Sequence, residues 1–203
     1  ILMKKLKKYY QDKFNMYGPK PTGVSWSNNK KTKLRYKNLL KVLNFDRKSN
    51  FSILDVGCGY GELINYLPIN KKYQYTGIDI VNEMINYAKK KQKKKNLEFK
   101  LKNIYNLSKK YDFIVCNGLF FLKNNLSNKE MKIFVSKCIN IFYKFSKIGF
   151  SFNIMSENVD YKSKILFYTK LTSTLKILSC KKISKIIVDC QSVNYETFFF
   201  IKK

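Results

Sequence analysis

Short apolar runs alternate with segments of helical periodicity along most of the chain. The apolar runs predict strands at residues 51–56, 73–79, 97–102, 111–116, 148–154, 183–190 and 195–202. Apolar residues spaced three and four apart predict helices at residues 4–16, 28–44, from about 62, 81–95, 127–145 and 163–178. Residues 17–26 contain two prolines and two glycines and therefore predict a loop.

The order of these elements predicts the fold class. Strands that alternate with helices form right-handed crossovers, which build a parallel sheet with helices on both faces. The last two strands follow one another, and too few residues separate them for a crossover. We therefore expect an α/β domain whose final strand runs antiparallel to its neighbours.

Length and composition fit one domain over residues 1–203. The chain is 45% hydrophobic, which is enough for a full core. It has no apolar run of about 18 residues, and its start lacks the apolar region of a signal peptide. The five cysteines form no CxxC pair, which argues against a disulfide framework and a zinc site. We therefore expect a cytoplasmic protein without a metal.

The charge allows two interpretations. Lys and Arg number 41 against 13 Asp and Glu, which gives a net charge of +28. Such an excess is typical of nucleic-acid-binding proteins. The lysines are nevertheless spread over almost every segment, and only Arg35 and Arg47 are arginines, the usual bidentate partner of guanine and phosphate. Solvated lysines are the favoured interpretation, and nucleic acid is a disfavoured partner.

The stretch ILDVGCGYGELINYL, residues 53–67, carries the strongest chemical signal. It places three glycines between a predicted strand and a predicted helix, at Gly57, Gly59 and Gly61. Ligands of α/β sheets bind at such turns. Position 62 is Glu instead of the third glycine of a dinucleotide loop, and the P-loop pattern is absent. Asp55 precedes the glycines, and its carboxylate favours a cationic ligand.

A second carboxylate narrows the choice of ligand. Asp79 ends the next predicted strand, where an acidic residue can accept hydrogen bonds from ribose hydroxyls. A ligand with a ribose, an ammonium group and a sulfonium group suits both Asp55 and Asp79. These features indicate S-adenosylmethionine (SAM), with S-adenosylhomocysteine (SAH) as its product.

These motifs resemble those of the class I SAM-dependent methyltransferases. LDVGCGYG is similar to their first motif and YTGIDI to their second, and the resemblance extends over residues 51–154. It implies a three-layer Rossmann-like fold with a seven-stranded, mostly parallel sheet in the order 3-2-1-4-5-7-6 and an antiparallel last strand. We expect a SAM-binding core at residues 49–203, preceded at residues 1–48 by an N-terminal helical lid that the finer resemblance described below implies.

The resemblance assigns roles to individual residues. Asp55, Gly57 and Gly59 would surround the methionine part of SAM. Asp79 would bind the ribose hydroxyls, and Ile80 would lie against the adenine. The full set of cofactor-binding candidates is Trp26, Arg35, Asp55, Gly57, Cys58, Gly59, Asp79, Ile80, Met84, Asn103, Ile104 and Asn117.

Three candidates carry more specific expectations. Asn103 stands where the family often has an acidic residue, and its side-chain oxygen would accept from the adenine amino group. Arg35 would pair with the SAM carboxylate, with a surface arginine as the alternative. Asn117 follows the fourth strand and would line the point of methyl transfer.

A finer resemblance concerns the acceptor. The segments YYQDKFNMYGPKPTGVSW, LRYKNLL and GFSFNIMSENVDY are similar to those of small bacterial methyltransferases that accompany capsule or other surface-glycan biosynthesis. This implies a small acceptor, such as a sugar, a nucleotide-linked precursor or a phosphoramidate. It would also make Tyr17 and Trp26 walls of the pocket, with a core position as the alternative for Trp26.

Methyl transfer asks a protein mainly to position the acceptor and to exclude water. The chain has no histidine, so a general base would be of another type, and an acceptor that is already an anion needs none. The acceptor-side candidates are Tyr17, Asn117, Asn153, Glu157, Asp160 and Tyr161, and spacing favours none of them.

Two other function classes stay open. An RNA or DNA methyltransferase is the alternative, but NGLFF at residues 117–121 keeps only the Asn of the (D/N)PP(Y/F/W) motif and lacks both prolines. A non-catalytic subunit with a SAM-binding fold is disfavoured by the intact glycine loop. The sequence leaves the acceptor atom, oxygen or nitrogen, and the oligomeric state undetermined.

Overall fold

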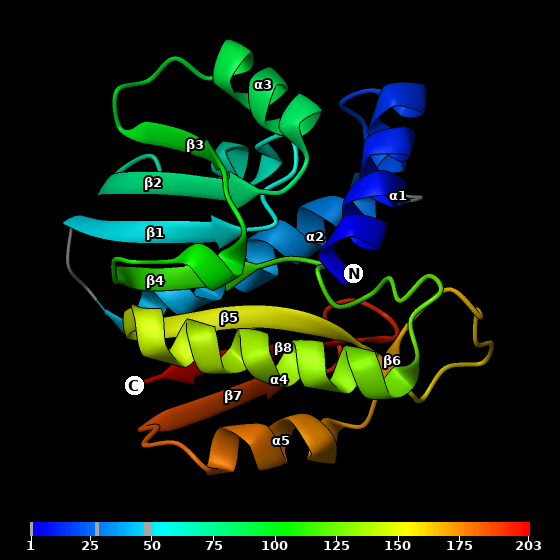
Figure 1. Cartoon of the computed structure of the whole chain (residues 1–203). Helices are drawn as coiled ribbons and strands as arrows, with labels where there is room; N and C mark the ends of the chain where they lie inside the picture. The colour runs from blue at the N-terminus through cyan, green and yellow to red at the C-terminus, as the bar shows by residue number, and fades with distance from the viewer. Residues whose placement is uncertain (1, 27–28, 47–49) are drawn as a thin grey trace.

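The computed structural model describes residues 2–26, 29–46 and 50–203, and an eight-stranded sheet forms its centre (Figure 1). The strands are β1 (Asn50–Val56), β2 (Lys72–Asp79), β3 (Leu97–Leu101), β4 (Tyr111–Cys116), β5 (Ser146–Ser156), β6 (Tyr168–Thr169), β7 (Lys185–Asp189) and β8 (Glu196–Lys202). Their order is β3-β2-β1-β4-β5-β8-β7, and the short β6 pairs with β5 off this path. With β6 set aside, this is the predicted order 3-2-1-4-5-7-6.

The strand directions also confirm the prediction. β1 pairs in parallel with β2 and β4, and β4 pairs in parallel with β5. β8 runs antiparallel to both β5 and β7. Asp55 on β1 is in register with Gly77 on β2 and with Val115 on β4. Because parallel strands end at the same edge of a sheet, the residues that follow β1, β2 and β4 meet there.

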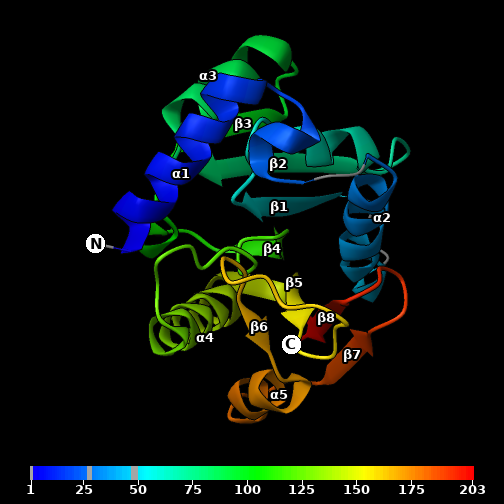
Figure 2. The same cartoon turned by 90° about the vertical axis from the view of Figure 1, so that its right-hand side faces the viewer.

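Helices cover both faces of this sheet (Figure 2). The α-helices are α1 (Leu2–Tyr17), α2 (Asn29–Leu39), α3 (Asn82–Lys91), α4 (Asn128–Phe145) and α5 (Leu171–Ser179), and the 3-10 helices are η1 (Pro21–Val24), η2 (Leu40–Phe45), η3 (Glu62–Tyr66) and η4 (Ile104–Asn106). α4 and α5 share one hydrophobic core with the sheet, and α2, η2 and α3 share another. The chain therefore has the three layers that the alternating pattern predicts.

The sequence of α4 shows how one of these layers is specified. The Ser127 hydroxyl accepts a hydrogen bond from the Glu130 N–H at 3.2 Å, and the Glu130 carboxylate accepts one from the Ser127 N–H at 2.8 Å. This reciprocal cap satisfies two free N–H groups at the start of the helix. Apolar residues at helical spacing then face the sheet and are buried, namely Met131, Phe134, Val135, Cys138, Ile139 and Phe142.

The helix predicted from residue 62 is wrong in length, because only the 3-10 helix η3 forms there. Pro68 disfavours a helical conformation in the preceding residue, and Leu67 is extended, with φ −65° and ψ 145°. The helix predicted at residues 28–44 is likewise divided into α2 and the 3-10 helix η2.

The helix predicted at residues 163–178 begins only at Leu171. The residues before it pair with other strands instead. The Phe167 N–H donates to the Phe121 carbonyl oxygen at 2.7 Å, and β6 pairs in parallel with β5. Tertiary hydrogen bonds thus override the local helical periodicity.

The segment expected to form a lid, residues 1–48, has two separate roles. α1 lies beyond the C-terminal ends of β1 and β2 (Figure 1). Phe14 stacks on Tyr60 with ring centroids 6.3 Å apart, and Gln11 Nε2 donates to Glu83 Oε1 at 2.6 Å. Leu6 and Phe14 of α1 are buried in hydrophobic clusters, and α2 and η2 contribute buried residues to another. Of these helices, α1 is the one that lies beyond the strand ends, where a lid is expected.

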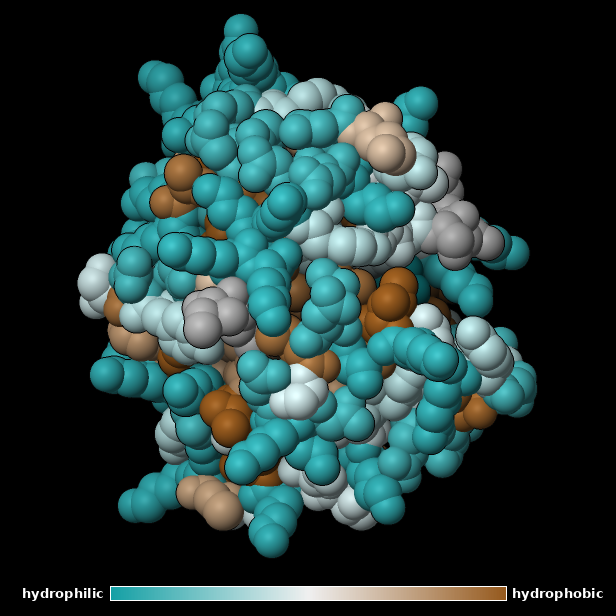
Figure 3. All heavy atoms as spheres, turned by 45° about the vertical axis from the view of Figure 1, so that its right-hand side comes forward, coloured by the Kyte–Doolittle hydropathy of each residue, from teal (hydrophilic) through white to brown (hydrophobic). Residues whose placement is uncertain are grey.

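The surface is largely hydrophilic in the view of Figure 3, with a few hydrophobic side chains visible near its middle. Exposed lysines lie on α1, α3 and α4 alike. Within the described residues, no helix has both the length and the apolar character needed to cross a membrane.

Candidate functional site

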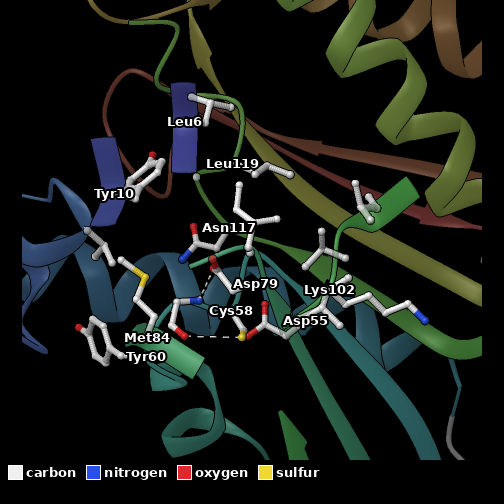
Figure 4. A pocket seen from close by; sticks show the side chains of 18 of the residues that line it. Leu6, Tyr10, Asp55, Cys58, Tyr60, Asp79, Met84, Lys102, Asn117 and Leu119 are labelled. Carbon is white, nitrogen blue, oxygen red and sulfur yellow. Dashed lines mark hydrogen bonds between the residues drawn. The ribbon is translucent and has the colours of Figure 1, made fainter. Parts of the chain in front are cut away.

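A cavity lies at the C-terminal ends of β1, β2 and β4, with α1 forming one of its walls (Figure 4). The predicted cofactor-binding residues that line it are Trp26, Asp55, Gly57, Cys58, Gly59, Asp79, Ile80, Met84, Asn103, Ile104 and Asn117. Arg35 is the one candidate of that set that does not line it. The parallel strands therefore bring together residues far apart in sequence at the predicted edge.

The glycine loop is held by the neighbouring strand. The N–H groups of Gly57 and Cys58 donate to the Ile78 carbonyl oxygen at 2.9 and 3.0 Å. Gly57 and Gly59 adopt positive φ values of 72° and 54°, a region that residues with a side chain rarely occupy. Glycine therefore allows the loop to follow this path without backbone strain.

The three glycines serve two different purposes. A Cβ atom added at Gly57 or Gly59 would meet no atom closer than 3.6 Å, so the space next to these residues is open. A Cβ at Gly61 would lie 2.9 Å from the Phe99 ring. The first two glycines thus give a ligand access to the backbone, whereas Gly61 allows close packing between the loop and β3.

Asp79 connects this loop to β2. Its Oδ2 accepts a hydrogen bond from the Gly59 N–H at 2.9 Å, and its Oδ1 accepts one from the Val81 N–H at 2.9 Å. Burial raises the pKa of Asp79, and the backbone hydrogen bonds oppose that rise. Each carboxylate oxygen retains a second lone pair, which suits the ribose hydroxyls of the expected ligand.

Asp55 is more deeply buried than Asp79, with 2% of its surface exposed. The Tyr75 hydroxyl donates to its Oδ2 at 2.8 Å. The pKa of Asp55 is raised to about 7, mainly by burial; the hydrogen bond from Tyr75 opposes this rise and the charge of Asp79 adds to it. A cationic ligand next to Asp55 would favour its ionised form.

The side of the cavity expected to hold adenine is built from Ile80, Met84, Asn103 and Ile104. The Asn103 side-chain oxygen accepts a hydrogen bond from the Tyr105 N–H at 3.1 Å and thereby caps η4. The oxygen expected to accept from the adenine amino group is therefore already used once. Its second lone pair is the one left for a ligand.

The N-terminal segment supplies walls that the sequence analysis did not assign to the site. Met3, Leu6 and Tyr10 of α1 line the cavity, as does Tyr36 of α2. The apolar side of the helix predicted at residues 4–16 was the available signal, but its packing partner could not be identified from sequence. Burial raises the pKa of Tyr10, which keeps its hydroxyl protonated.

The structure gives Arg35 a different partner from the predicted one. Its Nε donates to Glu196 Oε1 at 2.7 Å, and its Nη2 makes a second, shorter hydrogen bond to the same oxygen. The guanidinium carbon lies 5.0 Å from the centre of the Trp26 ring. Arg35 thus forms an ion pair with a buried carboxylate of β8 and does not line the cavity, and its pairing with the SAM carboxylate stays a prediction.

Asn117 lines the cavity, and Asn153 lies in contact with it. Asn153 Oδ1 accepts a hydrogen bond from the Gly118 N–H at 2.8 Å. Asn153 Nδ2 donates to Asn117 Oδ1 at 3.1 Å and to Glu196 Oε2 at 3.0 Å. Asn153 therefore supports Asn117 without lining the cavity itself.

The other acceptor-side candidates lie outside the cavity. Tyr17 lies under the Lys13 ammonium, 5.1 Å from the ring centre, and Tyr161 is 79% exposed. Asp160 accepts a hydrogen bond from the Tyr195 hydroxyl, and Glu157 Oε1 lies 3.8 Å from Lys170 Nζ. The structure thus does not place these four residues at the site. Among the described residues, no group of His, Cys, Asp or Glu side chains could hold a metal ion.

Comparison with known proteins identifies relatives of this chain. Residues 47–190 match the family described as Methyltransferase domain. The chain is 30% identical over 186 residues to malonyl-(acyl-carrier protein) O-methyltransferase of Acetivibrio thermocellus, an alignment that covers 81% of this chain and 65% of that protein. The chain spans 35% to 66% of the length of its curated relatives.

Two solved structures share the fold. Magnesium protoporphyrin IX methyltransferase of Synechocystis PCC 6803 with bound SAH has a TM-score of 0.70 at 16% identity, covering 100% of both chains. The N-methyltransferase NodS of Bradyrhizobium japonicum WM9 with bound SAH has a TM-score of 0.69 at 14% identity, covering 97% of both chains. The family match and the observed sheet order therefore agree, and the chain belongs to the class I SAM-dependent methyltransferases, a family whose cofactor is SAM.

Proposed function

We propose that this chain transfers a methyl group from SAM to a small-molecule acceptor bound next to Asn117. The observation that supports this most strongly is that the Gly57–Gly59 loop, Asp79 and Asn117 line the same cavity. SAM would supply a methyl group already activated by its sulfonium. Asp79 and the glycine loop would hold it, and Asn117 would stand at the acceptor side.

The position of α1 beside the cavity supports a small acceptor. Met3, Leu6 and Tyr10 form a wall of the cavity, and Leu6 is 3% exposed. A small acceptor needs no wide opening in such a wall, and the wall would exclude water from the reaction. We therefore propose that α1 acts as a lid in a single catalytic domain.

The acceptor itself is proposed from sequence resemblance. The relatives carry names with different acceptors, malonyl-(acyl-carrier protein) and magnesium protoporphyrin IX, and both O- and N-methyltransferases occur among them. The resemblance of the N-terminal and β5 segments to glycan-associated enzymes supports a sugar, a nucleotide-linked precursor or a phosphoramidate of capsule or surface-polysaccharide biosynthesis. The five free cysteines support a cytoplasmic location.

A nucleic-acid methyltransferase is the second candidate, favoured by the net charge of +28. Of the two arginines, Arg35 forms an ion pair with the buried Glu196, so its guanidinium is not available for a bidentate contact with phosphate. The exposed lysines are distributed over several elements. We therefore propose that any nucleic-acid binding is weak and independent of sequence.

An assay of SAH release tests this function. Purified protein with SAM is presented with sugars, sugar nucleotides, carboxylic acids and amines, and in parallel with RNA and DNA, at about 150 mM salt. We expect release with a small molecule and none with nucleic acid. The Gly59→Val variant is the control and should release none. Saturable methylation of one RNA or DNA site would establish the second candidate instead.

A further inference from the structure

Asn117 carries a hydrogen-bond donor without a partner. Its Nδ2 is buried and has no hydrogen-bond partner among the residues that the structure describes. The residue is 8% exposed and lines the cavity. Figure 4 shows its amide among the side chains around the cavity. A buried donor without a partner is unfavourable, so a partner supplied by a ligand would stabilise the bound state.

The orientation of the Asn117 amide follows from the backbone. The Gly118 N–H can only donate, so the Asn153 atom 2.8 Å from it must be the oxygen. The other end of the Asn153 amide is then its NH₂ group, which can only donate to Asn117 at 3.1 Å. Asn117 must therefore present its oxygen to Asn153, which leaves its NH₂ group without a partner among the described residues.

A buried ion pair fixes the same orientation a second time. Glu196 is 2% exposed, and its Oε2 accepts the other N–H of Asn153 Nδ2 at 3.0 Å. Its Oε1 is held by Arg35. Because an ionised carboxylate only accepts hydrogen bonds, Asn153 must turn its NH₂ group toward Glu196. The hydrogen bonds of Asn153 with Gly118 and with Glu196 therefore require the same orientation of its amide group.

We propose that Asn117 Nδ2 donates a hydrogen bond to the acceptor atom, and that this atom is the oxygen of an ionised acid, such as a carboxylate. This inference rests on the proposed methyltransferase function and specifies its substrate class. An amine nitrogen has one lone pair, which it must use to attack the methyl group. A carboxylate oxygen has further lone pairs, so it can attack with one and accept from Asn117 with another.

The described residues that line the cavity supply few candidate bases, which supports an acceptor that arrives ionised. Burial raises the pKa of the lining Tyr10, Tyr36, Tyr60 and Cys58, which keeps them protonated, and the carboxylates of the lining are Asp55 and Asp79. They belong to β1 and β2, and each already accepts hydrogen bonds within the protein. In the proposed step the acceptor oxygen forms a bond to the methyl carbon while the carbon–sulfur bond breaks. The electron pair of that bond stays on sulfur, giving a methyl ester and SAH with no proton released.

Nuclear magnetic resonance of the Asn117 side-chain NH₂ group tests this proposal without knowledge of the full substrate. The protein is loaded with SAH and titrated with acetate or with methylammonium, each to about 100 mM, since fragments of this size bind weakly. Asn117→Leu identifies the resonance by its disappearance. We expect acetate to shift the Asn117 signals and methylammonium to leave them unchanged.

The outcomes separate this inference from the proposed function. A shift caused by methylammonium instead of acetate, or by neither probe, overturns the oxygen acceptor while SAH binding stands. Calorimetry that shows no SAH binding would refute the methyltransferase function itself. As a second measurement, Asn117→Asp should lower turnover of carboxylates by about 100-fold or more, because it replaces the donor with an acceptor and places two like charges side by side. Calorimetry should show that this variant still binds SAH, because the glycine loop and its hydrogen bond to Asp79 are unchanged.

Discussion

The carboxylate of Asp79 accepts a hydrogen bond from the Gly59 N–H at 2.9 Å, so the residue that ends β2 fixes the loop that follows β1. The same carboxylate also holds the Val81 N–H at the start of α3. The two sequence motifs are therefore physically one unit. A ligand that binds Asp79 meets a loop that Asp79 has already positioned.

This arrangement predicts that Asp79→Ala affects both binding and stability. SAM affinity should fall by about 1.5–3 kcal/mol through loss of hydrogen bonds to a charged group. The free energy of unfolding should also fall, because two backbone N–H groups lose their acceptor. Asp79→Asn keeps one side-chain oxygen and should lie between the two proteins. Calorimetry with SAM and chemical denaturation measure the effects, and unchanged SAM affinity in folded Asp79→Ala would refute the assignment.

The glycines predict two opposite kinds of variant. Gly57→Val and Gly59→Val should abolish SAM binding, because the side chain enters open space next to the loop. Their positive φ values add a cost of about 1–2 kcal/mol, which should leave the protein folded. Gly61→Ala is the matched comparison. Its Cβ would contact Phe99 at 2.9 Å, so it should lower Tm more than Gly57→Val does.

Thermal unfolding with and without SAM distinguishes these variants. The wild type should gain Tm on addition of SAM. The Val variants should show no gain, whereas any folded Gly61→Ala protein should still respond. A gain equal to that of the wild type in Gly59→Val would show that the loop does not contact the ligand.

Asp55 predicts a pH dependence of SAM binding. Its pKa of about 7 in the free protein means that it is protonated at lower pH, whereas a cationic ligand prefers the ionised form. SAM affinity should therefore fall as pH falls through 7. Asp55→Asn should remove that part of the dependence, and the difference between the two proteins cancels titration of SAM itself. Identical pH profiles in calorimetry would contradict this role.

The raised pKa of Asp55 also affects the free energy of unfolding. The folded pKa lies above the ordinary value of about 3.9, so the folded state retains this proton to higher pH than the unfolded chain. The contribution of Asp55 is complete below the unfolded value and is lost as pH rises through about 7. Asp55→Asn should therefore reduce the decline of the unfolding free energy between about pH 4 and pH 7.

Arg35 predicts a loss of stability that exceeds any loss of SAM affinity. Removal of the guanidinium would leave Glu196 buried without its cation, which typically costs about 3–5 kcal/mol. Arg35→Met/Glu196→Gln should recover part of this loss, because no buried charge then remains. Urea denaturation measures both variants. A stable Arg35→Met protein with strongly weakened SAM binding would instead support the original expectation of a cofactor ligand.

The sequence predicted the parts of the molecule that local patterns encode. The parallel sheet and its antiparallel final strand followed from alternation and from the direct succession of the last two strands, whereas the strand order followed from the family resemblance. The cofactor side followed because Asp55, the glycines and Asp79 sit at strand ends, and parallel pairing must bring such ends together. The strand β6 was missed, because its pairing depends on contacts with β5 that no local pattern reveals.

The acceptor side of the cavity could not be predicted either, because it depends on contacts between residues far apart in sequence. Arg35 and Glu196 are 161 positions apart, and Asn153 and Asn117 are 36 apart. Spacing carries no information about such pairs. Tyr161 and Asp160 were plausible by chemistry alone, but they lie on a segment outside the cavity. Composition also suggested a nucleic-acid surface, which the ion pair of Arg35 with Glu196 makes less favourable.

A crystal structure of the chain with SAH tests the central claim most directly. We predict SAH in the cavity at the ends of β1, β2 and β4, with its ribose hydroxyls within hydrogen-bond distance of Asp79. Its adenine should lie against Ile80, and its sulfur should face Asn117. SAH bound elsewhere, or a crystal soaked with SAH in which the cavity holds none, would contradict the account.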